Sequence, residues 1–98
     1  MLTFEKVLEV FGEYLAEDKS NEVLHTRRGY MVVNWENCEN DWVTGQLCHT
    51  PKDLRDVLRF SYVEYQGFCL TDGYRRDLTE QEDRDIEQMG MDLAARCE

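Results

Sequence analysis

Proline and low-complexity sequence are almost absent from this chain. Its 98 residues contain 1 proline, and no biased tract interrupts them. A chain of this length fits one compact domain, and a second domain would need a linker that the sequence lacks. We therefore expect a single domain over residues 1–98.

Positive charge is also scarce. Asp and Glu number 21 against 11 Lys and Arg, which gives a formal net charge of -10. Binding to DNA, RNA or an anionic membrane surface requires cations that face the phosphates. The charge balance therefore argues against direct nucleic-acid binding and against attraction to such membranes.

Long hydrophobic runs are missing as well. No stretch approaches the ~20 apolar residues that cross a bilayer, and the first residues lack the layout of a signal peptide. We expect a cytoplasmic protein without a membrane segment. The even number of cysteines leaves a disulfide framework open, but buried reduced thiols are favoured because two of them fall on apolar faces of predicted helices. These cysteines are Cys38, Cys48, Cys69 and Cys97.

Motifs that carry chemistry are missing too. Structural zinc sites bring cysteine or histidine ligands in pairs about two to five residues apart, and no such pair occurs here. Cys48 and His49 are adjacent, yet neighbouring strand side chains point to opposite faces, so the imidazole does not meet the thiol. No nucleophile elbow, phosphate loop or His-Glu-x-x-His motif is present. We expect no metal, no cofactor and no catalytic residue.

Amphipathic helical patterns occur at both ends of the chain. Thr3 caps a predicted helix whose apolar residues recur at helical spacing through Leu15. Near the other end, Thr79 and Glu82 form a capping box before a helix that extends to Cys97. The apolar stripe of this last helix is narrow, so we expect it on the outside of the fold.

A longer helix is predicted between them. Thr50 is its cap and Pro51 occupies its first position. Besides its main apolar face, it carries a second apolar stripe formed by Phe60, Val63 and Gly67. A helix that is apolar on two sides needs two neighbours. One is the sheet or the first helix, and the other is the last helix or another protein chain.

Three short strands are predicted between the first two helices, at residues 22–27, 30–35 and 41–48, with a hairpin loop at 37–40. Their short connections favour an antiparallel meander. The element order α-β-β-β-α-α defines an α+β fold class, with a three-stranded antiparallel meander and helices packed on one face.

The faces of this sheet can be assigned from the alternation of side chains. Val33 and Trp35 share one face, which we expect to lie under the helices. The alternation breaks at Trp42, so the register of the third strand stays open, and Gly45 is a candidate position for a bulge that switches the parity. The open face is expected to carry His25, Tyr30, Val32 and Asn34.

The acidity is concentrated in the two outer helices. Residues 1–20 sum to -3 and residues 79–98 to -5, whereas residues 51–78 are neutral. The first helix carries one carboxylate per turn, and we call this line the acidic ridge: Glu5, Glu9, Glu13 and Glu17. A solvated surface is the ordinary interpretation. The alternative is a surface that binds a basic protein, or one that imitates nucleic-acid phosphates.

Basic residues of the central segment allow two interpretations. Local ion pairs with nearby aspartates are favoured over a positive patch that faces the acidic ends of a second copy. The basic residues are Arg27, Arg28, Lys52, Arg55, Arg59, Arg75 and Arg76.

Two resemblances bear on function. The α-β-β-β-α beginning resembles a double-stranded RNA-binding domain in element order alone, because the charges of residues 51–56 cancel where that family has a lysine cluster. Residues 2–8, 50–56 and 73–79 resemble small uncharacterised acidic proteins of conjugative elements and prophages of anaerobic Gram-positive bacteria. This second resemblance implies a bacterial accessory protein and transfers no functional residue.

Three functional hypotheses remain, in this order. The first is a non-enzymatic module that binds another protein, which could be basic, or a second copy of itself as a homodimer. Its candidate surfaces are the stripe of Phe60, Val63 and Gly67 and the open sheet face. The second is an inhibitor that imitates nucleic acid through the acidic ridge and so blocks a DNA-binding protein or nuclease. The third is a small enzyme.

Overall fold

The computed structural model describes residues 1–35 and 42–98, with side chains for all of these except 42–44. Three strands stand between two pairs of helices, in the expected order. The elements are α1 (Phe4–Val10), α2 (Gly12–Glu17), β1 (Asn21–Thr26), β2 (Gly29–Trp35), β3 (Trp42–Cys48), α3 (Pro51–Leu70) and α4 (Glu80–Arg96). The α+β class is confirmed. The hairpin loop predicted at residues 37–40, with Cys38, lies outside the described residues.

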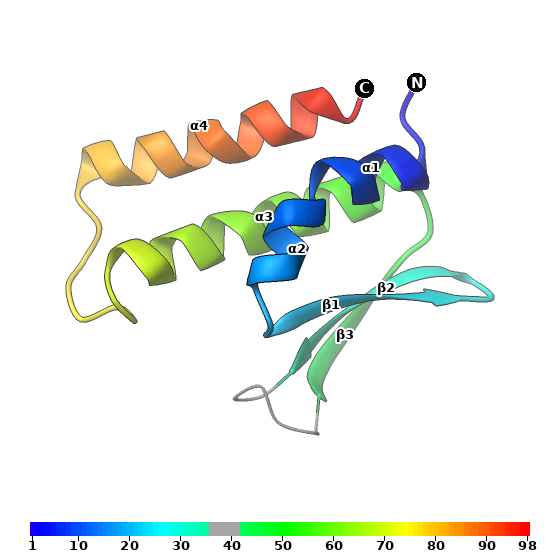
Figure 1. Cartoon of the computed structure of the whole chain (residues 1–98), viewed down its shortest axis with the longest axis horizontal. Coiled ribbons are helices and arrows are strands. Elements are labelled where there is room, and N and C mark those ends of the chain that lie inside the picture. Colours follow the sequence, from blue (N-terminus) through cyan, green and yellow to red (C-terminus); the bar gives the residue numbers. More distant parts are fainter. Residues whose placement is uncertain (36–41) are drawn as a thin grey trace.

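The first helical segment consists of two helices that meet at Phe11. Thr3 caps α1 as expected, because its Oγ1 accepts a hydrogen bond from the Lys6 N–H at 3.1 Å. Phe11 stands between the helices with φ -90° and ψ 5°, and the poor helix former Gly12 follows it. The chain therefore changes direction between α1 and α2 (Figure 1), while the Phe11 ring is completely buried.

The sheet is an antiparallel meander in the order β1-β2-β3, as predicted. Its register shifts between the pairs Asn34↔Thr44 and Trp35↔Trp42, so the additional residue of β3 lies between positions 42 and 44. Gly45 is paired regularly with Val33. The bulge predicted at Gly45 is therefore wrong by two positions.

The assignment of the sheet faces is also wrong. Val32 is 6% exposed and belongs to the main core, and the Tyr30 ring lies 4.8 Å from that of Phe4. The side of the sheet under the helices therefore carries Tyr30 and Val32 rather than Val33. Because β2 is apolar on both sides, the alternation of its side chains does not show which side faces the helices. The packing of the helices decides, since Val32 belongs to the same buried cluster as Val7, Leu54 and Leu58, whereas Val33, although 2% exposed, lies outside it.

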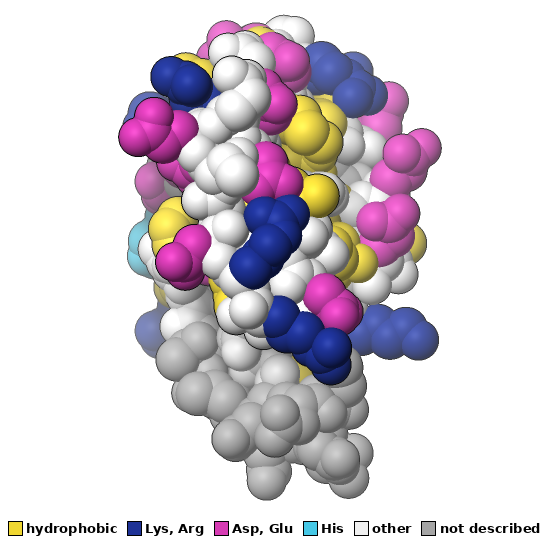
Figure 2. Space-filling view, turned by 90° about the vertical axis from the view of Figure 1, so that its left-hand side faces the viewer, with side chains coloured by type: hydrophobic (Ala, Val, Ile, Leu, Met, Phe, Trp, Pro, Cys, Tyr) yellow, Lys and Arg dark blue, Asp and Glu magenta, His cyan; other side chains and the backbone are white. Residues whose placement is uncertain are grey.

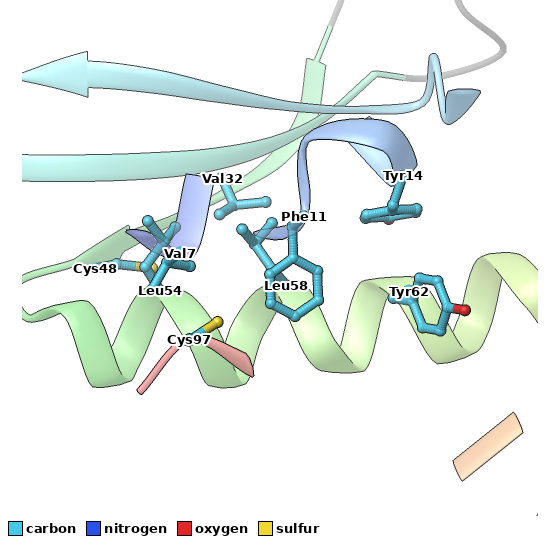
Figure 3. Close-up of a cluster of buried hydrophobic side chains, with 9 residues drawn as sticks. All are labelled: Val7, Phe11, Tyr14, Val32, Cys48, Leu54, Leu58, Tyr62 and Cys97. Carbon is cyan, nitrogen blue, oxygen red and sulfur yellow. The ribbon is translucent and has the colours of Figure 1, made fainter. Parts of the chain in front are cut away.

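Helices α1, α2 and α3 lie on one side of the sheet, and α4 lies beyond α3 (Figure 1). The core between α1, α3 and the sheet includes Val7, Phe11, Leu54 and Leu58, each 0% exposed (Figure 3). Helix α3 thus has the two neighbours that its two apolar sides require, the sheet layer and α4.

Close contact between α3 and α4 depends on Gly90. A Cβ atom at this position would lie 2.9 Å from Val63 Cγ2 and 3.3 Å from Arg59 Cγ. At the beginning of α4, the predicted capping box is present, with the Glu82 N–H and the Thr79 hydroxyl 3.1 Å apart. Among the described residues, no helix combines the length and apolar character that a membrane span needs.

Candidate functional site

The second apolar stripe of α3 is not a single exposed surface. Phe60 is 67% exposed and is not covered by α4. Val63 is half-buried because it packs where Gly90 of α4 approaches, and Gly67 is buried beneath Tyr74. Gly67 is therefore too buried to belong to the candidate interaction surface, and Phe60 is the one residue of the three that is largely exposed.

The acidic ridge borders a hollow rather than a flat helix surface. Glu5 and Glu9 lie on α1 and Glu13 and Glu17 on α2, and all four are exposed. A hollow of about 310 Å³ between α1–α2, α3 and α4 is lined by Glu9, Glu13 and Glu17 but not by Glu5. We call it the acidic groove. Arg96 is the cation that lines it.

Tyrosines and a buried aspartate support one wall of this groove. The rings of Tyr14 and Tyr62 meet edge to face with centroids 5.5 Å apart, and both residues line the groove. The Tyr14 hydroxyl donates to Asp18 Oδ2 at 2.7 Å, and Asn21 Nδ2 donates to the same oxygen at 2.7 Å. Burial, together with Asp18, raises the pKa of Tyr14, so its hydroxyl stays neutral and remains a donor. The network fixes the junction of α2 with β1.

A second hollow, of about 410 Å³, lies beside the groove and shares Glu17 with it. We call it the aromatic pocket and define it by Glu17, Glu64, Tyr65, Phe68 and Tyr74. The Phe68 and Tyr74 rings meet edge to face with centroids 5.8 Å apart, and the two residues are 52% and 53% exposed. The end of the molecule seen in Figure 2 carries exposed hydrophobic side chains among acidic and basic ones.

The backbone that places Tyr74 is unusual. Asp72, Gly73 and Tyr74 all have positive φ, at 53°, 80° and 63°. The buried Thr71 holds this turn, because its hydroxyl donates to Gly67 O at 2.7 Å and accepts from the Tyr74 N–H at 2.9 Å. No local pattern in the sequence indicates that Tyr74 folds back over α3.

The basic residues described on α3 and after it are largely paired within the chain. Lys52, Arg55 and Arg75 pair with nearby aspartates, as expected from the sequence, whereas Arg76 pairs with a glutamate and Arg55 also contacts Glu98. The pairs are Lys52–Asp56 at 3.2 Å, Arg55–Glu98 at 3.0 Å, Arg75–Asp72 at 3.5 Å and Arg76–Glu82 at 2.8 Å.

The thiols and imidazoles do not form a reactive cluster. Cys48, Cys69 and Cys97 are free thiols, so the disulfide framework that their number left open is not formed between them. Burial and the nearby Asp53 raise the pKa of Cys48, the opposite direction from an activated nucleophile. The His25 ring stacks on Tyr30. Within residues 1–35 and 42–98, no group of three or more metal-ligating side chains is assembled.

Comparison with known protein families, curated proteins and solved structures gives no match to this chain. The resemblance to proteins of mobile elements therefore stays a prediction.

Proposed function

We propose that this protein is a non-enzymatic module that binds a basic segment of another protein in the acidic groove. The observation that carries the proposal is the placement of Glu9, Glu13 and Glu17 along one hollow. Within the described residues, Glu13 and Glu17 have no ion-pair partner, and Lys6 Nζ approaches Glu9 only to 3.9 Å. These carboxylates are available to cations from outside the chain.

The lining of the groove supports a basic partner. Residues of α1, α2, α3 and α4 line it, and tyrosine rings contribute apolar surface between its charged groups. Carboxylates arranged in this way attract basic segments from solution and select against acidic ones. Such a partner also agrees with the formal net charge of -10.

The proposal is tested with a short oligo-arginine peptide and two variants of equal charge. The first variant carries Glu9→Gln, Glu13→Gln and Glu17→Gln, and the control carries Asp77→Asn, Asp83→Asn and Glu87→Gln. All three control positions are exposed and do not line the groove. Fluorescence anisotropy at low and high salt measures the affinity of each protein.

We expect the groove variant to bind at least about fivefold more weakly than the control, since three exposed ion pairs together contribute about 1–3 kcal/mol. The difference should shrink as salt is added. Equal affinities of the two variants, or no binding by the wild-type protein, would overturn the proposal.

A further inference from the structure

We infer that the aromatic pocket receives the side chain of an arginine from the basic segment. The inference rests on the proposed function, because it names the residue that anchors the segment. Glu17 lines both the groove and the pocket, so a chain that follows the carboxylates of the groove comes directly to the pocket. Its volume of about 410 Å³ accommodates a long side chain.

Aromatic faces make the pocket suitable for a cation with a flat, weakly hydrated head. Tyr65, Phe68 and Tyr74 line it, and the edge-to-face arrangement of Phe68 and Tyr74 leaves ring surface exposed to solvent. A guanidinium stacks on such surfaces through cation–π attraction, and its long stem covers apolar carbon at the same time. An ammonium is more strongly hydrated and gains less from stacking.

The charges around the pocket favour a cation as well. Its lining contains the carboxylates of Glu17, Asp18 and Glu64 against the single ammonium of Lys19. The Asp18 carboxylate is committed to Tyr14 and Asn21, which leaves Glu17 and Glu64 for an incoming charge.

The two arginines that follow Tyr74 in the sequence are already paired inside the chain. Arg75 contacts Asp72 at 3.5 Å, and both terminal nitrogens of the Arg76 guanidinium donate to the Glu82 carboxylate at 2.8 Å. An arginine from outside therefore meets little competition for the carboxylates at the pocket.

The placement of Tyr74 has a conformational cost. A non-glycine residue at φ 63° is strained, and such strain is concentrated at binding sites. The Tyr74 ring packs over Gly67, where a Cβ atom would lie in ordinary van der Waals contact, 3.6 Å from the Tyr74 hydroxyl oxygen. That hydroxyl in turn donates to the Glu64 carbonyl oxygen at 3.2 Å and lies 3.4 Å from Oε2 of the same residue. The turn thus joins an aromatic ring and a carboxylate at the pocket.

The test compares oligo-arginine and oligo-lysine peptides of equal length on three proteins. These are the wild type, Phe68→Leu in the pocket, and Phe60→Leu as the matched control. Phe60 is exposed on the same helix but does not line the pocket. Leucine keeps apolar bulk and removes the aromatic face, so the comparison isolates stacking. Anisotropy gives the ratio of the two affinities for each protein.

We expect the wild type and Phe60→Leu to prefer oligo-arginine, and Phe68→Leu to lose about two- to fivefold of that preference. Retention of the full preference in Phe68→Leu, or equal binding of both peptides by the wild type, would overturn this inference alone. The proposed function would still stand if the glutamine variant of the groove bound more weakly than its control. Absence of binding by either peptide would overturn both.

Discussion

Replacement of Gly29 by alanine is the sharpest test of how the sheet is built. Gly29 begins β2 with φ 135°, a conformation that L residues rarely adopt. A Cβ atom there would also lie 2.5 Å from the carbonyl oxygen of Cys48 on β3. The Cβ position is fixed by the backbone of residue 29 and the oxygen belongs to the backbone of Cys48, so rotation of a side chain does not relieve the contact.

The expected magnitude follows from these two contributions. A strained backbone conformation costs about 1–3 kcal/mol, and inserting an atom into a packed site costs about 1–3 kcal/mol. Gly29→Ala should therefore reduce the free energy of unfolding by about 2–6 kcal/mol, a large part of the ~5–15 kcal/mol typical of a domain. Urea unfolding followed by far-ultraviolet circular dichroism measures the change.

Gly12→Ala is the matched control for this substitution. No heavy atom lies within 4 Å of a Cβ built at Gly12, which is the first residue of α2. We expect this variant to be as stable as the wild type or more stable by up to about 1 kcal/mol. If the two alanine variants had equal unfolding free energies, the reasoning about Gly29 would be refuted.

Two further predictions concern α4. Gly90→Ala should destabilise the protein by about 1–3 kcal/mol because of the contact with Val63, and should become neutral or stabilising in a Val63→Ala background, as measured by a double-mutant cycle in urea. Arg76 and the Thr79 N–H hold the pKa of Glu82 at about 2, below its ordinary value of 4.5. The ionised Glu82 carboxylate therefore stabilises the folded protein above pH 4.5, and this contribution is lost as the pH falls towards 2. Between pH 4.5 and 2, the unfolding free energy of Glu82→Gln should fall less than that of the wild type. Equal losses in acid unfolding experiments would contradict the lowered pKa of Glu82.

Local signals of the sequence were sufficient for much of the fold. Thr3, Thr50 and Thr79 each cap a helix in the structure, because a cap depends on residues within one turn of it. The break at Phe11 was missed because the apolar spacing continues through it. The covered side of the sheet was missed because β2 offers apolar residues on both sides, and only the long-range packing of the helices distinguishes them.

The candidate site was predictable only in part. The spacing of Glu9, Glu13 and Glu17 already placed their carboxylates on one side of the first helical segment. The aromatic pocket could not be predicted from the sequence, because Tyr74 reaches Phe68 through three successive residues with positive φ. Those are properties of the folded backbone rather than of the local pattern.

The two apolar sides of β2 have a consequence for the uniqueness of the fold. A slip of β2 by one residue would exchange one apolar set for the other at little hydrophobic cost. Polar contacts at the two ends of the β1–β2 hairpin oppose this slip. The Thr26 hydroxyl donates to Gly29 O at 2.8 Å, and Trp35 Nε1 donates to Glu22 Oε2 at 2.8 Å. These two hydrogen bonds thus add to the packing of the helices in fixing which side chains of the sheet face the solvent.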